Sequence, residues 1–375
     1  NPEGGMTAAN EMLELNGKVA PGKADRVMLQ VQKEKNTWQH VIPVSKGQFS
    51  FRLPLFFGKG IHDVHVLVPD ENRENRFRFA ATILADNQSD RMMEPIEYHR
   101  EYEVRGVRLE KPSFGGEKAD LIYEIKGKID PLAPFAKETT HIYVKTEKGQ
   151  DEALDIIPVQ DYSFHGHIHL RFGRGEYKVT IHVPEPKEEN TATFSFLSVA
   201  SFHVTNTAQE DKRDLLPSRG IQSDSPKILA LAKELAKGSK TDRDKALAIY
   251  EYTARNVSYD VKKYQDNGFE WDDSALKTLE TGRGVCQDYA YLAAALLRAS
   301  NIESRFISGQ AGSGAKKENH AWIEAKLDGK WVTMDPTWGS GYVENGRFVS
   351  RYTADYFDPD PAVFNKTHIR DKPEY

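Results

Sequence analysis

Cysteine is almost absent from this sequence: Cys286 is the single cysteine among 375 residues. One thiol cannot form an intrachain disulfide, nor can it build a zinc site that needs several thiolates. Long apolar runs are also missing, because the longest stretch without charge or strong polarity, Tyr289 to Leu297, is far shorter than the roughly 20 residues of a membrane helix. The sequence therefore predicts neither a disulfide scaffold nor a membrane span.

A strong excess of one charge is missing too. The chain has 51 Lys and Arg against 56 Asp and Glu, a formal net charge of −5. No overall basic field exists to hold a nucleic-acid backbone, so we expect no nucleic-acid partner. Hydrophobic residues make up 39% of the chain and aromatic residues 10%, enough for folded cores. At roughly 150 residues per domain, the length predicts two or three domains.

The first half of the chain contains an internal repeat. Several blocks recur at an offset of 115 residues. Two flanking blocks recur at other offsets: Phe77-Arg78-Phe79 matches Phe194-Ser195-Phe196 at 117, and Asn16-Gly17-Lys18-Val19 matches Lys126-Gly127-Lys128-Ile129 at 110. Apolar residues alternate within each copy, as in β-strands, and Gly or Pro recurs roughly every 8 to 12 residues. We predict two tandem all-β, Ig-like sandwich domains at residues 1–104 and 105–210. The blocks at 115 are Ile42-Pro43-Val44 with Ile157-Pro158-Val159, Phe49 with Phe164, Phe57-Gly58-Lys59-Gly60 with Phe172-Gly173-Arg174-Gly175, and Val68-Pro69-Asp70 with Val183-Pro184-Glu185.

Helical signals begin after a polar connector at residues 205–219. Ser225-Pro226 is typical of a helix N-cap followed by Pro at the first helical position. Thr241-Asp242-Arg243-Asp244 resembles a capping box. We therefore predict a third domain of α+β class at residues 211–375.

Cys286 lies at the start of a predicted buried helix. Gly282 and Gly284 permit a tight entry, and the stretch after Cys286 consists of strong helix formers that are apolar on almost every face. The positive end of the helix dipole favours a thiolate in the first turn. The alternative is a cysteine that packs in the core as a small apolar residue.

A predicted hairpin brings a histidine and a carboxylate together. Asp328-Gly329 between alternating strands is a strong signal for a two-residue turn. In that register Leu327 faces Lys330, and His320 and Asp335 become diagonal neighbours with Cα atoms about 7 to 8 Å apart. A thiol at a helix start and a histidine held by a carboxylate form the nucleophile, base and orienting group of thiol acyl-transfer enzymes. The distance from Cys286 to His320 does not follow from the sequence.

Three blocks together resemble the core of the transglutaminase-like superfamily. The blocks keep their order, with 34 residues from Cys286 to His320 and 15 from His320 to Asp335. The resemblance covers roughly Ser225 to Tyr375 and does not extend to the β-repeats. Its tail is similar to bacterial and kyphoscoliosis-peptidase-like members. The blocks are Gly284-Val285-Cys286-Gln287-Asp288-Tyr289-Ala290, His320-Ala321-Trp322 and Asp335-Pro336-Thr337, and the tail runs from Tyr356-Phe357 through Pro361 and Phe364 to His368.

This resemblance implies a papain-like α+β core with a Cys286, His320 and Asp335 triad that works through a thioester. It implies the Cys286 backbone N–H as one oxyanion donor and leaves the second donor open. Tyr259 is our candidate for that donor, and Trp322 is a further candidate for oxyanion or substrate contact.

Two other groups of residues were weighed as metal sites. His165, His167 and His169 alternate, so they would share one face of a strand as zinc or copper ligands could, or simply form a solvated face. Glu270, Asp272 and Asp273 are acidic, yet their spacing does not demand calcium. We assign no metal and no cofactor.

The sequence thus predicts an enzyme for acyl transfer or hydrolysis at amides of proteins or cell-wall peptides. Whether water or an amine resolves the thioester is left open, and a Gly-rich segment from Gly309 to Lys317 is a candidate lid. The alternative function is a non-catalytic surface or scaffold protein that binds peptides through the same core. The chain begins at Asn1 rather than Met, which fits the loss of an export signal, and we expect a bacterial protein at the cell surface or outside the cytoplasm. The oligomeric state is left open.

Overall fold

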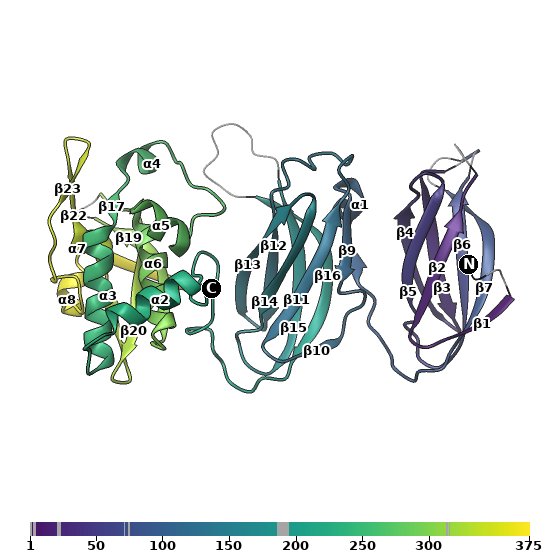
Figure 1. The fold of residues 1–375 in the computed structure, drawn as a ribbon, viewed down its shortest axis with the longest axis horizontal. Coiled ribbons are helices and arrows are strands. Elements are labelled where there is room, and N and C mark those ends of the chain that lie inside the picture. The colour runs from purple at the N-terminus through teal and green to yellow at the C-terminus, as the bar shows by residue number, and fades with distance from the viewer. Residues whose placement is uncertain are drawn as a thin grey trace.

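The structure is a computed structural model that describes residues 2, 5–20, 24–70, 72–73, 76–185, 195–312, 314 and 316–375. Over this described part, two β units and a mixed unit of helices and strands follow one another along the long axis of the molecule (Figure 1). None of the helices in these ranges is both long enough and apolar enough for a bilayer crossing.

The first β unit packs a larger sheet against a smaller one. The larger sheet has the order β1-β7-β6-β3-β4, with β1 parallel to β7 and the other pairs antiparallel. Strands β2 and β5 pair to form the smaller sheet. Leu15, Leu29 and Leu53 are among the side chains in the core that the sheets share. The strands are β1 (Gly5–Ala9), β2 (Met12–Lys18), β3 (Arg26–Lys33), β4 (Asn36–Pro43), β5 (Gln48–Pro54), β6 (Gly60–Pro69) and β7 (Phe77–Asn87).

The second β unit has the same strand order. Its strands run β10-β16-β15-β12-β13 and continue through β13 to β14-β11-β9. β10 is parallel to β16, as β1 is to β7. Ile142, Val179 and Phe202 are among the buried side chains of its core. The strands are β9 (Val107–Lys111), β10 (Glu117–Ala119), β11 (Ile122–Ile129), β12 (His141–Lys148), β13 (Asp151–Gln160), β14 (Ser163–His169), β15 (Gly175–Pro184) and β16 (Phe196–Asn206).

The strand positions agree with the sequence repeat. β3, β5 and β6 begin and end 115 residues before β12, β14 and β15. Gly17 pairs with Phe49 in the first unit, and Gly127 pairs with Phe164 in the second. A Cβ on either glycine would lie 2.2 or 2.3 Å from the facing ring. The matched glycines therefore leave room for the matched phenylalanines.

The last strand of each β unit corrects the predicted alignment. β7 and β16 are 119 residues apart, whereas Phe77-Arg78-Phe79 and Phe194-Ser195-Phe196 predicted 117. The reason is a pair of fully buried amides, Asn87 and Asn206, which donate to the carbonyls of matched glycines at 2.9 and 3.1 Å. These bonds fix where each strand ends. Phe194 lies outside the described residues.

The segment between the β units packs with the second one. β8 (Glu97–Tyr98) pairs with β16, and Tyr102 of α1 (Arg100–Val104) is buried in the second core. Tyr98 also stacks on His40 of the first unit, with ring centroids 4.0 Å apart. The predicted division after residue 104 therefore falls at the end of a segment that packs on the second unit.

The last unit combines an antiparallel sheet with helices. The sheet has the order β21-β20-β19-β24, and its outer strand β24 comes from the end of the chain. The helices are α2 (Pro226–Leu235), α3 (Asp242–Asn256), α4 (Val261–Gln265), α5 (Ala275–Thr281), α6 (Cys286–Ala299), α7 (Pro336–Ser340) and α8 (Pro361–Phe364). The strands are β17 (Ser258–Tyr259), β18 (Arg283–Gly284), β19 (Ser304–Ala311), β20 (Glu318–Leu327), β21 (Lys330–Met334), β22 (Gly341–Glu344), β23 (Arg347–Ser350) and β24 (His368–Glu374).

Helix α6 is the buried centre of this unit, as predicted. It contacts β19 and β20 of the sheet and helices α2, α3 and α5. Every residue from Tyr289 to Leu297 is buried. Burial of each leucine in this helix is worth about 1.5–3 kcal/mol. The core of the unit therefore fixes the position of the first residue of the helix, Cys286.

A polar interface joins the second β unit to the last unit. The fully buried Arg171 donates to both carboxylate oxygens of Asp155, at 2.8 and 2.9 Å, and to the carbonyl of Pro217 in the connector. The ring of His141 stacks on Trp271 at a centroid distance of 4.4 Å. Residues from the strands of the second β unit, from the connector and from the loop that carries Trp271 thus stabilise the interface together.

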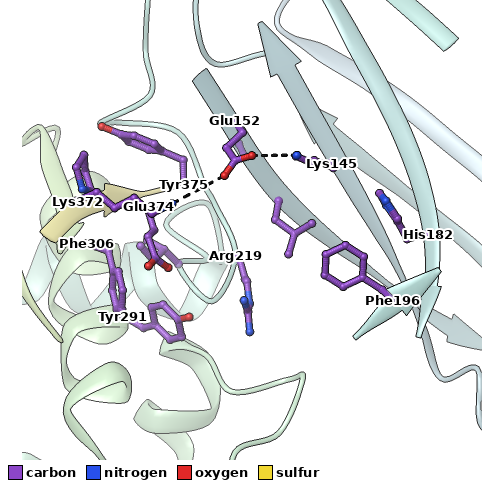
Figure 2. Close-up of a pocket in the computed structure, with 14 residues that line it drawn as sticks. Lys145, Glu152, His182, Phe196, Arg219, Tyr291, Phe306, Lys372, Glu374 and Tyr375 are labelled. Carbon is purple, nitrogen blue, oxygen red and sulfur yellow. Dashed lines mark ion pairs between the residues drawn. The ribbon is translucent and has the colours of Figure 1, made fainter. Parts of the chain in front are cut away.

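A pocket of about 440 Å³ lies at the same interface (Figure 2). Lys145 and Glu152 of the β unit form an ion pair at 2.9 Å on its wall, and Lys372 of β24 lies 3.9 Å from the same carboxylate group. The described residues that line this pocket do not include Cys286, His320 or Asp335. The candidate site lies elsewhere in the last unit.

Candidate active site

Cys286 is the first residue of α6. The chain enters this helix through β18, and Val285 is the N-cap residue. A Cβ on Gly284 would lie 2.4 Å from the Cβ of Asp288, so the close entry requires glycine. The first N–H groups of a helix have no intrahelical partner, and the helix dipole is positive there. Cys286 is partly exposed: it lines a cleft and also packs against the edge of the core.

A buried ion cluster holds the start of α6. The Val285 N–H donates to the Asp288 carboxylate at 2.7 Å. The Lys263 ammonium of α4 lies 2.8 Å from Asp288 and 2.8 Å from Asp273. Both carboxylates are at most 3% exposed. This cluster fixes the backbone that carries Cys286.

Replacing Lys263 with methionine should therefore destabilise the last unit. Buried Asp288 would lose its cation, and buried Asp273 would keep only Lys277, at 3.3 Å. We expect a loss of about 2–3 kcal/mol, somewhat less than for a fully buried ion pair because the lysine side chain is 15% exposed. Thermal and denaturant unfolding of the full chain would measure it. Lys262→Met is the matched control, since the exposed Lys262–Asp266 pair on the same helix should matter little. Equal effects of the two substitutions would contradict the role of the cluster.

The β20–β21 hairpin has the predicted register. Asp328 and Gly329 form its turn with positive φ values of 51° and 77°, and Leu327 pairs with Lys330. His320 Nε2 lies 2.8 Å from Asp335 Oδ2. The prediction that this hairpin brings His320 and Asp335 together is confirmed.

The Asp335 carboxylate is completely buried and is held from several sides. Its Oδ1 atom accepts the N–H groups of Thr337 and Trp338 at 2.9 and 3.1 Å, because Asp335 is also the N-cap of α7. Its Oδ2 atom contacts His320 and a second imidazole, His368. A carboxylate in this setting stays ionised in spite of its burial.

Electrostatics favour a protonated His320. Burial alone would lower the pKa of His320, but the Asp335 carboxylate, aided by Cys286, outweighs burial and raises it to about 10. Burial would likewise raise the pKa of Asp335, but the His320 charge and the hydrogen bonds from His320 and His368 hold it well below its usual range. Cys286 is one of the groups that raise the pKa of His320, so the thiol lies near the imidazole. Because His320 Nε2 faces Asp335, Nδ1 is the ring nitrogen left for Cys286.

Replacing His320 with glutamine should slow the alkylation of Cys286 by iodoacetamide, because the variant loses the imidazole whose pKa responds to Cys286. We expect the rate at pH 7 to fall about tenfold or more. Mass spectrometry of the modified chain would give the rates. Equal rates in the wild-type chain and in His320→Gln would contradict the pairing of the two side chains.

His368 is a site residue that sequence reasoning missed. It appeared only as part of the similar tail, without a role. It begins β24, is 2% exposed, and its Nε2 lies 3.1 Å from Asp335 Oδ2. His368 and Asp335 are 33 residues apart, and no local sequence pattern links them. The sequence therefore contains no signal for this contact.

The two predicted candidates beyond the triad have different surroundings. Tyr259 of β17 pairs with Gly284 of β18 and lines the cleft with Cys286. Burial, and then the charge of Cys286, raises its pKa. Trp322 is 1% exposed and packs against Phe364 and His368, away from the cleft. The prediction that Trp322 contacts substrate is therefore wrong: it shares a strand face with His320, but the end of the chain covers it.

The cleft has a volume of about 690 Å³ and is rich in aromatic side chains. Two of its rim residues, Tyr342 and Val343 on β22, are 45% and 49% exposed. The candidate lid is only partly described: residues 309–311 belong to β19 rather than to a loop, Gly312 and Lys316 line the cleft, and Ser313 and Ala315 lie outside the described residues. The aromatic lining residues are Tyr259, Tyr264, Trp338, Tyr342, Phe348 and Tyr356.

The described residues contain two clusters with the ligand types of metal sites. One is His320, Asp335 and His368, and the other is Glu270, Asp272 and Asp273. In the first, the imidazoles and the carboxylate already bond to one another. In the second, Lys277 lies among the carboxylates. The three alternating histidines of β14 form no such cluster in the described ranges, and His165 lies 2.9 Å from Glu124.

Comparisons with known proteins agree with the motifs of this unit. Residues 229–336 match the family model of the transglutaminase-like superfamily. The human and mouse kyphoscoliosis peptidases are each 29% identical over 154 residues, which is 38% of this chain. The match spans only 23% of the length of those relatives.

Solved structures with some similarity include a bacterial and a fish protein. The periplasmic domain of TgpA from Pseudomonas aeruginosa has a TM-score of 0.28 at 17% identity, covering 59% of this chain and 88% of that chain. Red sea bream transglutaminase has a TM-score of 0.26 at 11% identity, covering 62% of this chain and 50% of that chain.

Proposed function

We propose that the transglutaminase-like core, matched at residues 229–336, makes this chain a cysteine-dependent enzyme that cleaves or transfers the acyl group of peptide amides. The observation that carries the proposal is the arrangement of Cys286, His320 and Asp335. The thiol lies at a helix start on a cleft that His320 also lines, and His320 Nε2 lies 2.8 Å from a buried carboxylate. A core cysteine needs none of these features.

In the first half of the reaction, the Cys286 thiolate attacks the carbonyl carbon of the amide. His320 donates its Nδ1 proton to the leaving amine as the C–N bond breaks, which leaves a thioester on the sulfur and a neutral imidazole. Asp335 keeps the ring in the orientation that presents Nδ1 to the sulfur.

The negative oxygen of the tetrahedral intermediate needs hydrogen-bond donors. The backbone N–H of Cys286 lies in the first turn of α6, where no carbonyl of the helix accepts from it. The Tyr259 hydroxyl is our candidate for the second donor, because Tyr259 lines the same cleft and its pKa responds to the charge of Cys286. Its raised pKa keeps the hydroxyl protonated and able to donate.

In the second half, neutral His320 removes a proton from water or from an amine. The activated nucleophile attacks the thioester, the C–S bond breaks, and the thiolate and imidazolium are restored. Water gives hydrolysis, and an amine gives transfer. We favour hydrolysis of protein or cell-wall peptides, because exposed rim residues leave the cleft open to water.

The arrangement of the chain is part of the same proposal. We place two Ig-like domains, divided near residue 104, before a papain-like catalytic domain that begins near residue 211. Modules of this kind ahead of a catalytic domain suit a bacterial enzyme that works outside the cytoplasm on large peptide substrates.

The test is to incubate the full chain with glutamine-containing peptides and with cell-wall peptides, in the presence and absence of a labelled primary amine. Mass spectrometry distinguishes a shortened peptide or free acid from an amine adduct. We expect hydrolysis that requires Cys286. Adducts exceeding hydrolysis would make transfer the main reaction. Equal, background product from wild type and Cys286→Ala would favour the non-catalytic, peptide-binding scaffold.

A further inference from the structure

We propose that His368 is a positioning residue of this site, which holds the shared oxygen of Asp335 against His320 and so fixes the proton arrangement of the base. The inference rests on the proposed function. His368 touches neither Cys286 nor the carbonyl under attack, and it acts through Asp335.

The first argument is the way in which the Asp335 carboxylate is shared. The Nε2 atoms of His320 and His368 approach the same oxygen, Oδ2, at 2.8 and 3.1 Å. The other oxygen is occupied by two backbone N–H groups of α7. A carboxylate bound at both oxygens cannot rotate without losing charge-assisted hydrogen bonds. His368 therefore supplies the bond that keeps Oδ2 in line with His320.

The second argument is the rigid setting of the His368 ring. It stacks on Phe364, with ring centroids 3.7 Å apart and an angle of 11° between the ring planes. The ring centroid of Trp338 lies 4.5 Å from that of His368. Both rings of this clamp come from segments next to the site, namely α8 and α7. The ring can thus present only its Nε2 edge to Asp335.

The third argument is the proton on His368. The carboxylate oxygen Asp335 Oδ2, 3.1 Å away, can only accept, so Nε2 of His368 carries a proton that points to Asp335. The Nδ1 atom of His368 lies 2.9 Å from the Thr367 hydroxyl, which donates to the Phe364 carbonyl at 3.1 Å. Asp335 in turn receives an N–H from His320 at the same oxygen, which leaves His320 Nδ1 as the nitrogen that exchanges protons with the sulfur.

The consequence appears when His320 becomes neutral. Once His320 has given its proton to the leaving amine, the buried Asp335 charge loses its facing cation. The N–H of His368 continues to stabilise the carboxylate, so Asp335 stays ionised and does not take the remaining His320 proton. The groups that face His368 in this step are His320 from β20, Asp335 from the turn before α7, and the Thr367 hydroxyl.

Two substitutions separate this role from simple packing. His368→Phe keeps a ring for the Phe364 stack but removes the N–H, whereas His368→Gln loses the stack but keeps a donor toward Asp335. We expect His368→Phe to lower kcat/KM about 10- to 100-fold, mainly through kcat, and His368→Gln to recover most of the loss. A role in packing alone gives the reverse order, with Phe close to wild type, and would overturn the proposal.

Alkylation of Cys286 provides a readout that needs no substrate. Without the His368 N–H, Asp335 should be protonated more easily. The pH below which alkylation by iodoacetamide slows should therefore be higher in His368→Phe than in the wild-type chain, and His368→Gln should restore the wild-type value. If wild type turns over no peptide but this shift appears, the proposed function fails and the positioning role stands. An unshifted profile in a folded His368→Phe chain would overturn the positioning role alone.

A measurement on the wild-type chain covers the case in which a variant does not fold. Histidine-selective ¹⁵N labelling should show two downfield imidazole N–H protons, from His320 and His368, and Asp335→Asn should shift both. A downfield proton from His320 alone would overturn the inference.

Discussion

Cys286→Ala should lower peptide turnover by roughly 10⁴-fold or more while the chain keeps its fold. The reason is that the substitution removes the atom that forms the thioester, and the remaining imidazolium cannot replace it. The Cys286 side chain is only partly buried and lines the cleft, so its loss should leave the core around α6 intact.

The measurement is kcat/KM for a peptide that the wild-type chain turns over, with circular dichroism and thermal unfolding as checks on folding. Cys286→Ser is the matched variant: it keeps a nucleophilic atom but not an acidic thiol, and we expect it to be nearly as inactive. Turnover by Cys286→Ala close to the wild-type rate would assign the activity to another site.

Asp335→Asn should lower kcat/KM by about 10³- to 10⁴-fold. The backbone N–H groups of Thr337 and Trp338 require an acceptor, so the asparagine oxygen should take the place of Oδ1. Its amide NH₂ would then face the Nε2 atoms of His320 and His368, where both imidazoles now donate. Neutral His320 should then carry its proton on Nδ1 instead of Nε2. Nδ1 could no longer accept the proton of the Cys286 thiol.

The same substitution should change how stability depends on pH. The pKa of His320 is raised to about 10, so its contribution to stability is complete below its ordinary value of 6.5 and is lost as the pH rises through about 10. The pKa of Asp335 is lowered, so its contribution is present above its ordinary range and is lost on acidification. We expect the thermal unfolding midpoint of the wild-type chain to decrease as the pH rises from about 7 to 10. The midpoint of Asp335→Asn should vary much less between pH 5 and pH 10. Identical profiles would contradict the coupling.

Local geometry explains which parts of the site the sequence predicts. The Asp328-Gly329 turn sets the hairpin register, and that register alone brings His320 to Asp335. The glycines before Cys286 and the apolar helix after it predict a buried helix with the thiol at its start. The repeat offset likewise anticipates three strand pairs, because the whole segments between those strands have equal lengths in the two copies.

Contacts across long separations explain the rest. His368 and the covering of Trp322 both depend on where β24 and α8 pack, which nothing near His320 or Asp335 in the sequence specifies. The packing of β8 and α1 on the second β unit depends in the same way on a distant partner, β16. In each case the missing information is the tertiary position of a short segment with little pattern of its own.

The cleft position of Cys286 has a consequence for oxidative damage. A thiolate that is open to solvent reacts with peroxide to give a sulfenic acid, which is normally rescued when a neighbouring cysteine forms a disulfide with it. These 375 residues contain no second cysteine. Recovery of the oxidised site therefore depends on a thiol supplied from outside these residues, and continued exposure to peroxide would convert the sulfur to the sulfinic acid.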